Sequence, residues 1–173
     1  MMLTADQILK ENLLKLDNTK GKPAQVGYDL SVKALARIVY PGMVLCDRTI
    51  VPTYQAVELT SLATSDGYEF DGYYLTPGAY DITFHEGCKI PPNRTAKIRQ
   101  RSSLLRSGAI IASSIFDPGF ETDNIGTVLL VHHIIYIEKD ARCAQIYFQT
   151  NDSVDQDKLY SGQFQRDAQR NSK

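Results

Sequence analysis

The feature that most restricts the fold is a series of short apolar runs between residues 34 and 98, each ended by a turn signal. The turn signals are Tyr40-Pro41-Gly42, Val51-Pro52, Asp66-Gly67, Asp71-Gly72, Thr76-Pro77-Gly78, Glu86-Gly87 and Pro91-Pro92. Apolar runs this short suit strands better than helices, and turn residues at this spacing are typical of sandwiches and barrels. The sequence therefore predicts an all-β domain and not a β-α-β protein.

The two ends of the chain depart from this pattern. Residues 4–16 (TADQILKENLLKL) start with the cap-competent Thr4 and carry apolar residues at a helical period, which predicts a short N-terminal helix. Residues 17–22 are polar and contain Gly21, so we expect a loop. The sequence after residue 150 is polar. We therefore expect one β domain, a barrel or a sandwich, over residues 1–150 and a flexible C-terminal arm over residues 151–173.

Residues 127–137 (TVLLVHHIIYI) are a nearly continuous apolar run. Such a run predicts a strand that is buried on both faces, in a closed barrel or between copies of the chain. Its adjacent His132 and His133 alternate faces on a strand, so only one of them can point to any given site. We expect one histidine to be packed and hydrogen-bonded and the other to lie at a subunit contact.

The charge balance limits the possible partners. The 173-residue chain has 19 basic and 20 acidic residues and a formal net charge of −1, so no overall field attracts it to nucleic acid or to a membrane surface. No run of about 18 apolar residues occurs, and the N-terminus lacks the apolar segment of a signal peptide. We expect a soluble, cytoplasmic protein whose affinity for phosphate, if any, is local.

Metal and nucleotide motifs of the common kinds are missing from the sequence. Cys46, Cys88 and Cys143 form no CxxC pair, which argues against a zinc site and a disulfide framework. We expect each cysteine to pack as a small apolar residue in a reducing compartment. There is also no GxGxxG or GxxxxGK motif.

Residues 97–108 hold the densest set of anion-binding side chains. Arg101, Ser102 and Ser103 are adjacent, and Arg106 follows within little more than a helical turn. Guanidinium groups fit phosphate oxygens bidentately, and serine hydroxyls can complete the set of donors. The same residues would also suit a solvated helix start.

Asp117 precedes Pro118-Gly119, a pair that fixes one φ angle and frees the next. This predicts a carboxylate at a sharp turn that ends a strand. As with the arginines, a purely structural surface turn is the alternative.

Together, RSSLLRSG and, after a spacer, DPGF resemble the signature of the dUTP pyrophosphatase and dCTP deaminase superfamily. The opening MMLTADQILKENLL and the YYLTPG segment resemble deaminases, while RCAQIYF resembles a motif shared by both branches. The resemblance implies a distorted, β-clip type of β-barrel that forms a homotrimer, with sites for a pyrimidine deoxynucleoside triphosphate between subunits.

The resemblance also implies roles for individual residues. Asp29, in a GYDL motif, would act through water on the Mg²⁺ cofactor, and Asp117 and Arg106 would be catalytic. The residues implied in substrate binding are Arg101, Ser102, Ser103, Phe120, Gln145, Tyr160, Phe164 and Gln165. Among these, Phe120 would lie under the deoxyribose, and the last three belong to the arm that closes over the site. For Asp29 and Gln145, a structural role in a strand is the alternative.

One departure from the deaminase pattern bears on the reaction. The position of the deaminase glutamate, which activates water for attack on cytosine, falls on Val131, and no Asp or Glu lies between Asp123 and Glu138. A valine cannot transfer protons. We therefore expect hydrolysis of dUTP to dUMP and diphosphate. The alternatives are a dCTP deaminase, with or without hydrolase activity, and a non-catalytic nucleotide-binding or partner-binding member of the family. His132 or His133 could supply a base in a deaminase.

Overall fold

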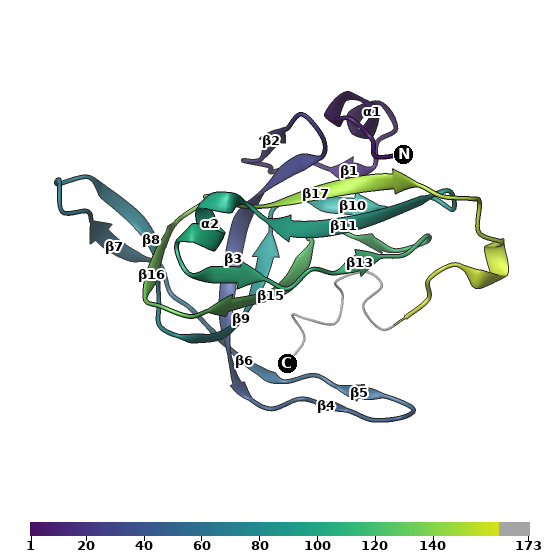
Figure 1. Cartoon of the computed structure of the whole chain (residues 1–173). Helices are drawn as coiled ribbons and strands as arrows, with labels where there is room; N and C mark the ends of the chain where they lie inside the picture. Colours follow the sequence, from purple (N-terminus) through teal and green to yellow (C-terminus); the bar gives the residue numbers. More distant parts are fainter. Residues whose placement is uncertain (163–173) are drawn as a thin grey trace.

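The computed structural model describes residues 1–162, and most of its strands belong to one strongly curved sheet (Figure 1). In spatial order the sheet contains β12 (Ala109–Ile111), β15 (Gly126–Val131), β9 (Gly78–Phe84), β3 (Tyr28–Tyr40), β17 (Arg142–Thr150), β11 (Arg94–Gln100) and β13 (Ile115–Phe116). The short strands β2 (Lys22–Pro23) and β6 (Thr53–Ala56) also pair with β3. All of these pairings are antiparallel, and the sheet curls into a half-barrel.

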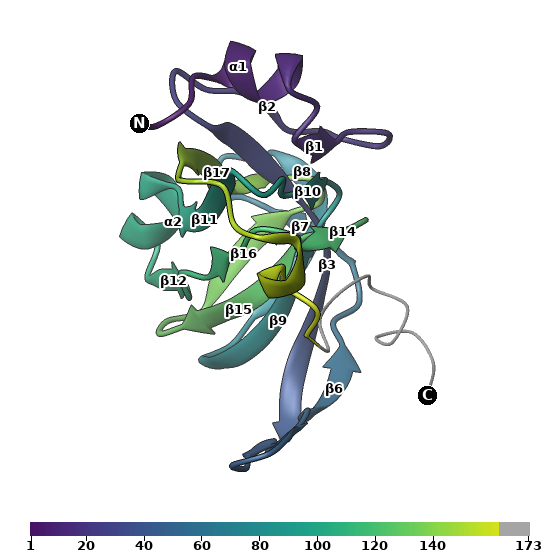
Figure 2. The same cartoon turned by 90° about the vertical axis from the view of Figure 1, so that its right-hand side faces the viewer.

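Smaller sheets complete the fold. One contains β1 (Leu14–Lys15), β10 (Gly87–Lys89) and β14 (Glu121–Thr122), and another β16 (Ile135–Glu138), β8 (Glu69–Leu75) and β7 (Thr60–Ala63). The strands β4 (Met43–Val44) and β5 (Thr49–Ile50) form a hairpin that extends away from the body beyond the end of β3 (Figure 2). The predicted all-β class is confirmed.

Turn chemistry located several strand ends correctly. β8 ends at Leu75 and β9 begins at Gly78, on either side of the predicted Thr76-Pro77 turn. The predicted turn at residues 91–94 closes through a hydrogen bond of 3.1 Å from the Arg94 N–H to the Pro91 carbonyl.

The helices differ from the prediction. α1 spans Ala5–Lys10 and starts with a capping box between Thr4 and Gln7, but it ends well before residue 16. Asn12 adopts a positive φ of 51°, which an α-helix does not accommodate, and Leu14–Lys15 joins a sheet instead. A second helix, α2 (Ser102–Arg106), begins after Arg101 as its cap residue, and a 3₁₀ turn covers Gln156–Lys158. The prediction of a single helix was wrong.

The predicted strand over residues 127–137 was also wrong in its extent. β15 ends at Val131, residues 132–134 turn, and β16 joins a different sheet. Burial alternates along both strands, so each has one buried face in the single chain, and Leu130 and Tyr136 are exposed. A continuous apolar run does not by itself reveal where a strand leaves one sheet for another.

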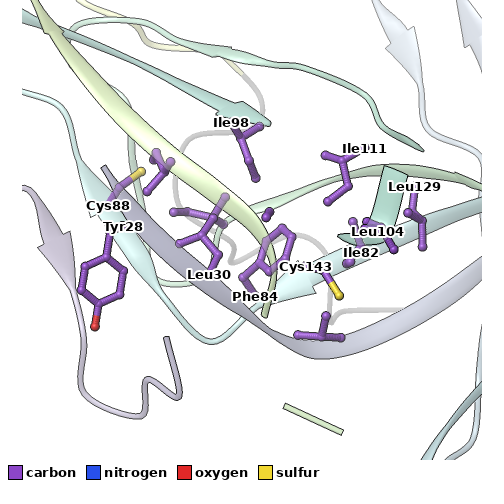
Figure 3. Close-up of a cluster of buried hydrophobic side chains, with 14 of the residues drawn as sticks. Tyr28, Leu30, Ile82, Phe84, Cys88, Ile98, Leu104, Ile111, Leu129 and Cys143 are labelled. Carbon is purple, nitrogen blue, oxygen red and sulfur yellow. The ribbon is translucent and has the colours of Figure 1, made fainter. Parts of the chain in front are cut away.

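The core lies inside the curve of the main sheet (Figure 3). Large side chains from different strands meet there, including Leu30 of β3, Phe84 of β9, Ile98 of β11 and Leu129 of β15, all fully buried. Each side chain of this size contributes about 1.5–3 kcal/mol by leaving water. Leu104 of α2 also belongs to this cluster, so the core fixes the helix that carries the predicted phosphate-binding residues.

Candidate nucleotide site

Three neighbouring strands build the first part of the site. Asp29 on β3 pairs with Gln145 on β17, which pairs with Arg99 on β11, and Arg101 follows directly after β11. Asp29 is buried, with 6% of its surface exposed. Its Oδ2 lies 3.5 Å from Arg101 Nε and 3.7 Å from Arg142 Nη1. We call Asp29, Arg101 and Arg142 the arginine cluster.

The short helix α2 presents the other predicted phosphate-binding side chains. Ser102 and Arg106 are four residues apart and so share one face of the helix, and both are exposed. Ser103 is also exposed, and its carbonyl accepts a hydrogen bond of 2.9 Å from the Ser107 hydroxyl. Because Leu104 is buried, the polar residues on either side of it are held at the surface next to the arginine cluster.

Gln145 has a local structural contact. Its Nε2 donates a hydrogen bond of 2.9 Å to the carbonyl of Val26, in the segment that leads into β3. Gln145 thus ties β17 to the chain just before Asp29. This contact matches the structural alternative for Gln145, and substrate binding by Gln145 stays a prediction.

The second part of the site surrounds Asp117. This exposed residue follows β13, and the Phe120 N–H closes the turn on the Asp117 carbonyl at 3.0 Å. Gly119 has a φ of +91°, in the region that favours glycine. The predicted sharp turn at a strand end is confirmed.

Aromatic side chains pack beside this turn. The Phe120 ring lies 5.2 Å from the Phe116 ring and 5.4 Å from the Tyr160 ring, measured between centroids. The Tyr160 N–H also donates to the Pro118 carbonyl at 2.8 Å. A Cβ at Gly119 would lie only 2.8 Å from Leu159 Cβ, so this contact needs glycine. The structure thus brings together Asp117, Phe120 and Tyr160, while Phe164 and Gln165 lie outside the described residues.

The two parts lie at opposite ends of the β11–β13 pair (Figure 1). Phe116 of β13 is opposite Ala96 of β11. Asp117 follows Phe116 directly, whereas Arg101 lies beyond the far end of β11, in the opposite direction. The offset is about six residues, or about 20 Å at the rise of an extended strand. One chain therefore does not bring Asp117 and Arg101 together.

A cleft of the described chain lies away from these residues. Its volume is about 550 Å³, and it is lined by Asp17, Asn18, Thr19, Lys20, Lys33, His85, Asn124, Lys139 and Asp140. None of the predicted site residues belongs to this lining. Apart from the buried Asp29, the predicted site residues within residues 1–162 are exposed or half-buried in a single copy.

Val131 is buried, with 4% of its surface exposed, and pairs with Ala109 and Gly78 of the adjacent strands. No carboxylate replaces it nearby on β15. His132 and His133 are both exposed in the turn after β15, so the expectation that one of them is packed was wrong. The turn, and not an alternating strand, determines their exposure.

The described residues offer no set of three or more His, Cys, Asp or Glu side chains that converge on a metal position. Asp29 is the one carboxylate in the arginine cluster. Mg²⁺ is often held by one or two carboxylates together with the phosphates of a substrate. The residues present thus fit a cation that arrives with the nucleotide better than a resident metal centre.

The cysteines follow the prediction in part. Cys88 and Cys143 are buried, but Cys46 is exposed near the tip of the β4–β5 hairpin, where there is no core to pack against. Burial raises the pKa of the Cys143 thiol to about 12, and the charge of Arg101 offsets part of that rise.

Sequence reasoning missed Arg142 as a site residue. It lies in the RCAQIYF segment, where attention fell on Gln145. Arg142 is the first residue of β17, and the pairing of β17 with β3, which brings Arg142 close to Asp29, is visible only in the fold.

Comparison with known proteins identifies the family of the chain. A family model described as dCTP deaminase-like matches residues 3–151, so the chain belongs to the dCTP deaminase-like family. Relatives named as nucleotidohydrolases for deoxyuridine 5′-triphosphate are similar to this chain along most of their length. A probable enzyme of this name from Halobacterium salinarum is 30% identical over 141 residues, which cover 82% of this chain and 81% of the relative. Another, from Methanocaldococcus jannaschii, is 32% identical over 126 residues, covering 72% and 76%.

A solved structure supports the fold. The 2′-deoxycytidine 5′-triphosphate deaminase from Agrobacterium tumefaciens superposes with a TM-score of 0.56 at 17% identity, over 87% of this chain. This chain spans 48% of the length of that protein. Within residues 1–162, neither helix reaches the length and apolar character that crossing a membrane requires.

Proposed function

We propose that this protein is a dUTP pyrophosphatase that converts dUTP and water to dUMP and diphosphate. The observation that carries this choice is that Val131, to which the family resemblance assigns the position of the deaminase glutamate, is a buried valine. A cytosine deaminase needs a proton-transferring group there, whereas hydrolysis of a phosphoanhydride does not. The names of the relatives support the same reaction.

The active site in this proposal lies between two copies of the chain in a homotrimer. Its support is the separation of Asp117 from Arg101 by about 20 Å in one chain, because each group alone lacks part of what the reaction requires. Exposed apolar side chains also need cover. Val44 of the protruding hairpin is 87% exposed and Ile134 is 54% exposed, and such residues are typical of surfaces that associate.

Each half of the site has its own chemistry. Arg101, Ser102, Ser103 and Arg106 supply guanidinium and hydroxyl donors that neutralise and orient the triphosphate. Asp117 orients the attacking water toward the α-phosphorus and accepts a proton from that water. Phe120 packs against the deoxyribose and disfavours a 2′-hydroxyl, and Gln145 and the C-terminal arm with Tyr160, Phe164 and Gln165 complete the enclosure.

Mg²⁺ bound to the phosphates would neutralise their charge during the reaction. Asp29 is the residue of this chain that would face its water shell. The carboxylate already lies between two arginines, so its charge is balanced before any nucleotide binds. This arrangement restrains the position of the Asp29 side chain.

The experiment that tests the proposal is incubation of the purified protein with dUTP and, separately, with dCTP, followed by chromatography of the products. We expect dUMP from dUTP and no product from dCTP. Formation of dUTP from dCTP would identify a deaminase, and no turnover of either nucleotide would indicate a binding protein.

A dCTP deaminase is the second candidate, favoured by the description of the matching family. The substitution Val131→Glu tests whether only the glutamate is missing. We expect no conversion of dCTP, because a carboxylate placed at this buried position lacks partners and is costly. Detectable deamination by the variant would show that the rest of a deaminase site is intact.

A further inference from the structure

The Nη1 atom of Arg142 is buried and has no hydrogen-bond partner. Within residues 1–162 it is the one buried side-chain nitrogen or oxygen of which this is true. Buried polar groups in native proteins are nearly always paired, and a buried donor left unpaired is costly. The position of this atom beside Asp29 makes a functional explanation testable.

The distances show a contact that is almost formed. Arg142 Nη1 lies 3.7 Å from Asp29 Oδ2, and Arg101 Nε lies 3.5 Å from the same oxygen. Charge-assisted N–H···O bonds are usually about 2.7–2.9 Å long, so a movement of about 1 Å would complete both. The Asp29 side chain is only 8% exposed, which limits the competition from water.

A β-bulge places Arg142 there. The pairing of β17 with β3 shifts between Arg142 and Ala144, so Cys143 is the extra residue. Both carbonyls at the bulge accept from Arg101: that of Cys143 from the Arg101 N–H at 2.8 Å, and that of Arg142 from Arg101 Nη1 at 3.2 Å. Bulges often re-aim side chains beside active sites. Here the bulge fixes the backbone and the side chain of Arg101 together.

We propose that Arg142 is a positioning residue for nucleotide binding: it holds Asp29, and with it Arg101, and its Nη1 closes onto Asp29 when the triphosphate binds. This inference rests on the proposed function. Because two guanidinium groups face one carboxylate, the cluster keeps a surplus positive charge for the phosphates. Without Arg142, Arg101 alone would have to pair with Asp29. Its guanidinium group would then be less available to bind the phosphates of the substrate.

The test compares Arg142→Gln and Arg142→Lys with the wild type. Steady-state kinetics with dUTP and calorimetric titration with a non-hydrolysable α,β-imido analogue separate binding from turnover. We expect Arg142→Gln to raise KM and Kd by about tenfold to a hundredfold, with a smaller effect on kcat. Arg142→Lys keeps the charge without the fork and should fall between Arg142→Gln and the wild type.

Arg37 provides the matched control. It lies on β3, the strand that carries Asp29, and donates hydrogen bonds to the Thr76 hydroxyl at 2.6 Å and the Pro77 carbonyl at 3.1 Å. Arg37→Gln should lower the melting temperature without changing Kd. A comparable loss of affinity in Arg37→Gln would show that general destabilisation explains the effect at Arg142.

Coupling to Asp29 is the decisive measurement. In a double-mutant cycle, Asp29→Asn combined with Arg142→Gln should weaken binding of the analogue much less than the product of the two single effects. Additive effects, or an unchanged Kd in folded Arg142→Gln, would overturn the proposal. If Arg142→Gln does not fold, an unchanged Kd in Arg142→Lys would overturn it equally.

Failure of this inference is distinguishable from failure of the proposed function. If the wild type hydrolyses dUTP and Arg142→Gln behaves like it, only the role of Arg142 is refuted. If the wild type hydrolyses no dUTP but binds the analogue with the predicted coupling, the positioning role stands and the proposed reaction is refuted. If the wild type neither hydrolyses dUTP nor binds the analogue, both are refuted.

Discussion

The two ends of the β11–β13 pair are built in different ways. At one end, Arg101 is held by residues from distant parts of the chain, Asp29 on β3 and the bulge in β17. At the other, Asp117 is held by a tight turn that closes within four residues, and aromatic rings flank it. A network of charges suits a fixed cationic surface for phosphate, whereas an exposed carboxylate on a turn suits a group that acts on water. The difference implies that binding and chemistry can be impaired separately.

The strongest way to break this comparison is Asp117→Asn. The amide keeps the size and much of the hydrogen bonding but cannot accept the proton of water. We expect kcat for dUTP to fall by about 10²–10⁴-fold while the Kd for the non-hydrolysable analogue stays within a few fold. Quench-flow or product chromatography gives the rate. Unchanged hydrolysis would remove Asp117 from the mechanism.

Arg101→Ala should have the opposite profile. Loss of a charge-assisted contact in a desolvated site should weaken triphosphate binding by on the order of 2–5 kcal/mol. Titration calorimetry measures the affinity, and circular dichroism checks the fold. A folded variant with wild-type affinity would show that Arg101 does not bind the triphosphate and that the arginine cluster only stabilises the packing of β17.

The same difference explains what could be predicted from the sequence. The Asp117 turn depends on Pro118 and Gly119, whose backbone preferences act locally, so its geometry was predicted correctly. Likewise, Gly78 and the Pro91 turn marked strand ends. These signals need no knowledge of the tertiary structure.

Features that depend on pairing between distant strands were not predictable. The bulge at Arg142 and Cys143 exists only in the pairing of β17 with β3, and nothing in RCAQIYF marks the extra residue. The end of α1 is set by the left-handed Asn12 and by the pairing of Leu14 with Cys88, which override helical periodicity. The roles predicted for Phe164 and Gln165 stay predictions, because both residues lie outside the described part of the chain.

Mixing two inactive variants tests whether the two ends meet across subunits. If sites form between copies, co-expression of Asp117→Asn with Arg101→Ala should create some sites that have both wild-type residues. Random assembly of a cyclic trimer would restore about a quarter of the sites. Differently tagged copies, purified in tandem, isolate the mixed assemblies for assay. Activity no higher than that of the separate variants would place both ends of the site in one chain, and a monomeric mass by light scattering would exclude the trimer.

The smallest expected effect is on two buried thiols that report on the two ends separately. Cys143 lies at the bulge beside Arg101, while Cys88 pairs with Thr122 on β14, shortly after the Asp117 turn. The thiolate is the reactive form, and a pKa of about 12 leaves almost none of it at Cys143 near neutral pH. In timed iodoacetamide labelling followed by mass spectrometry, we therefore expect rapid modification of the exposed Cys46 and almost none of Cys88 or Cys143.

Because the pKa of Cys143 is raised, its labelling should increase only as the pH approaches that value or as the bulge opens. Arg142→Gln should speed labelling at Cys143 by a few fold and leave Cys88 unchanged, since only one end is loosened. If Arg142→Gln increased the labelling rates of Cys88 and Cys143 equally, the two ends of the β11–β13 pair would open together and would not act as independent parts of the site.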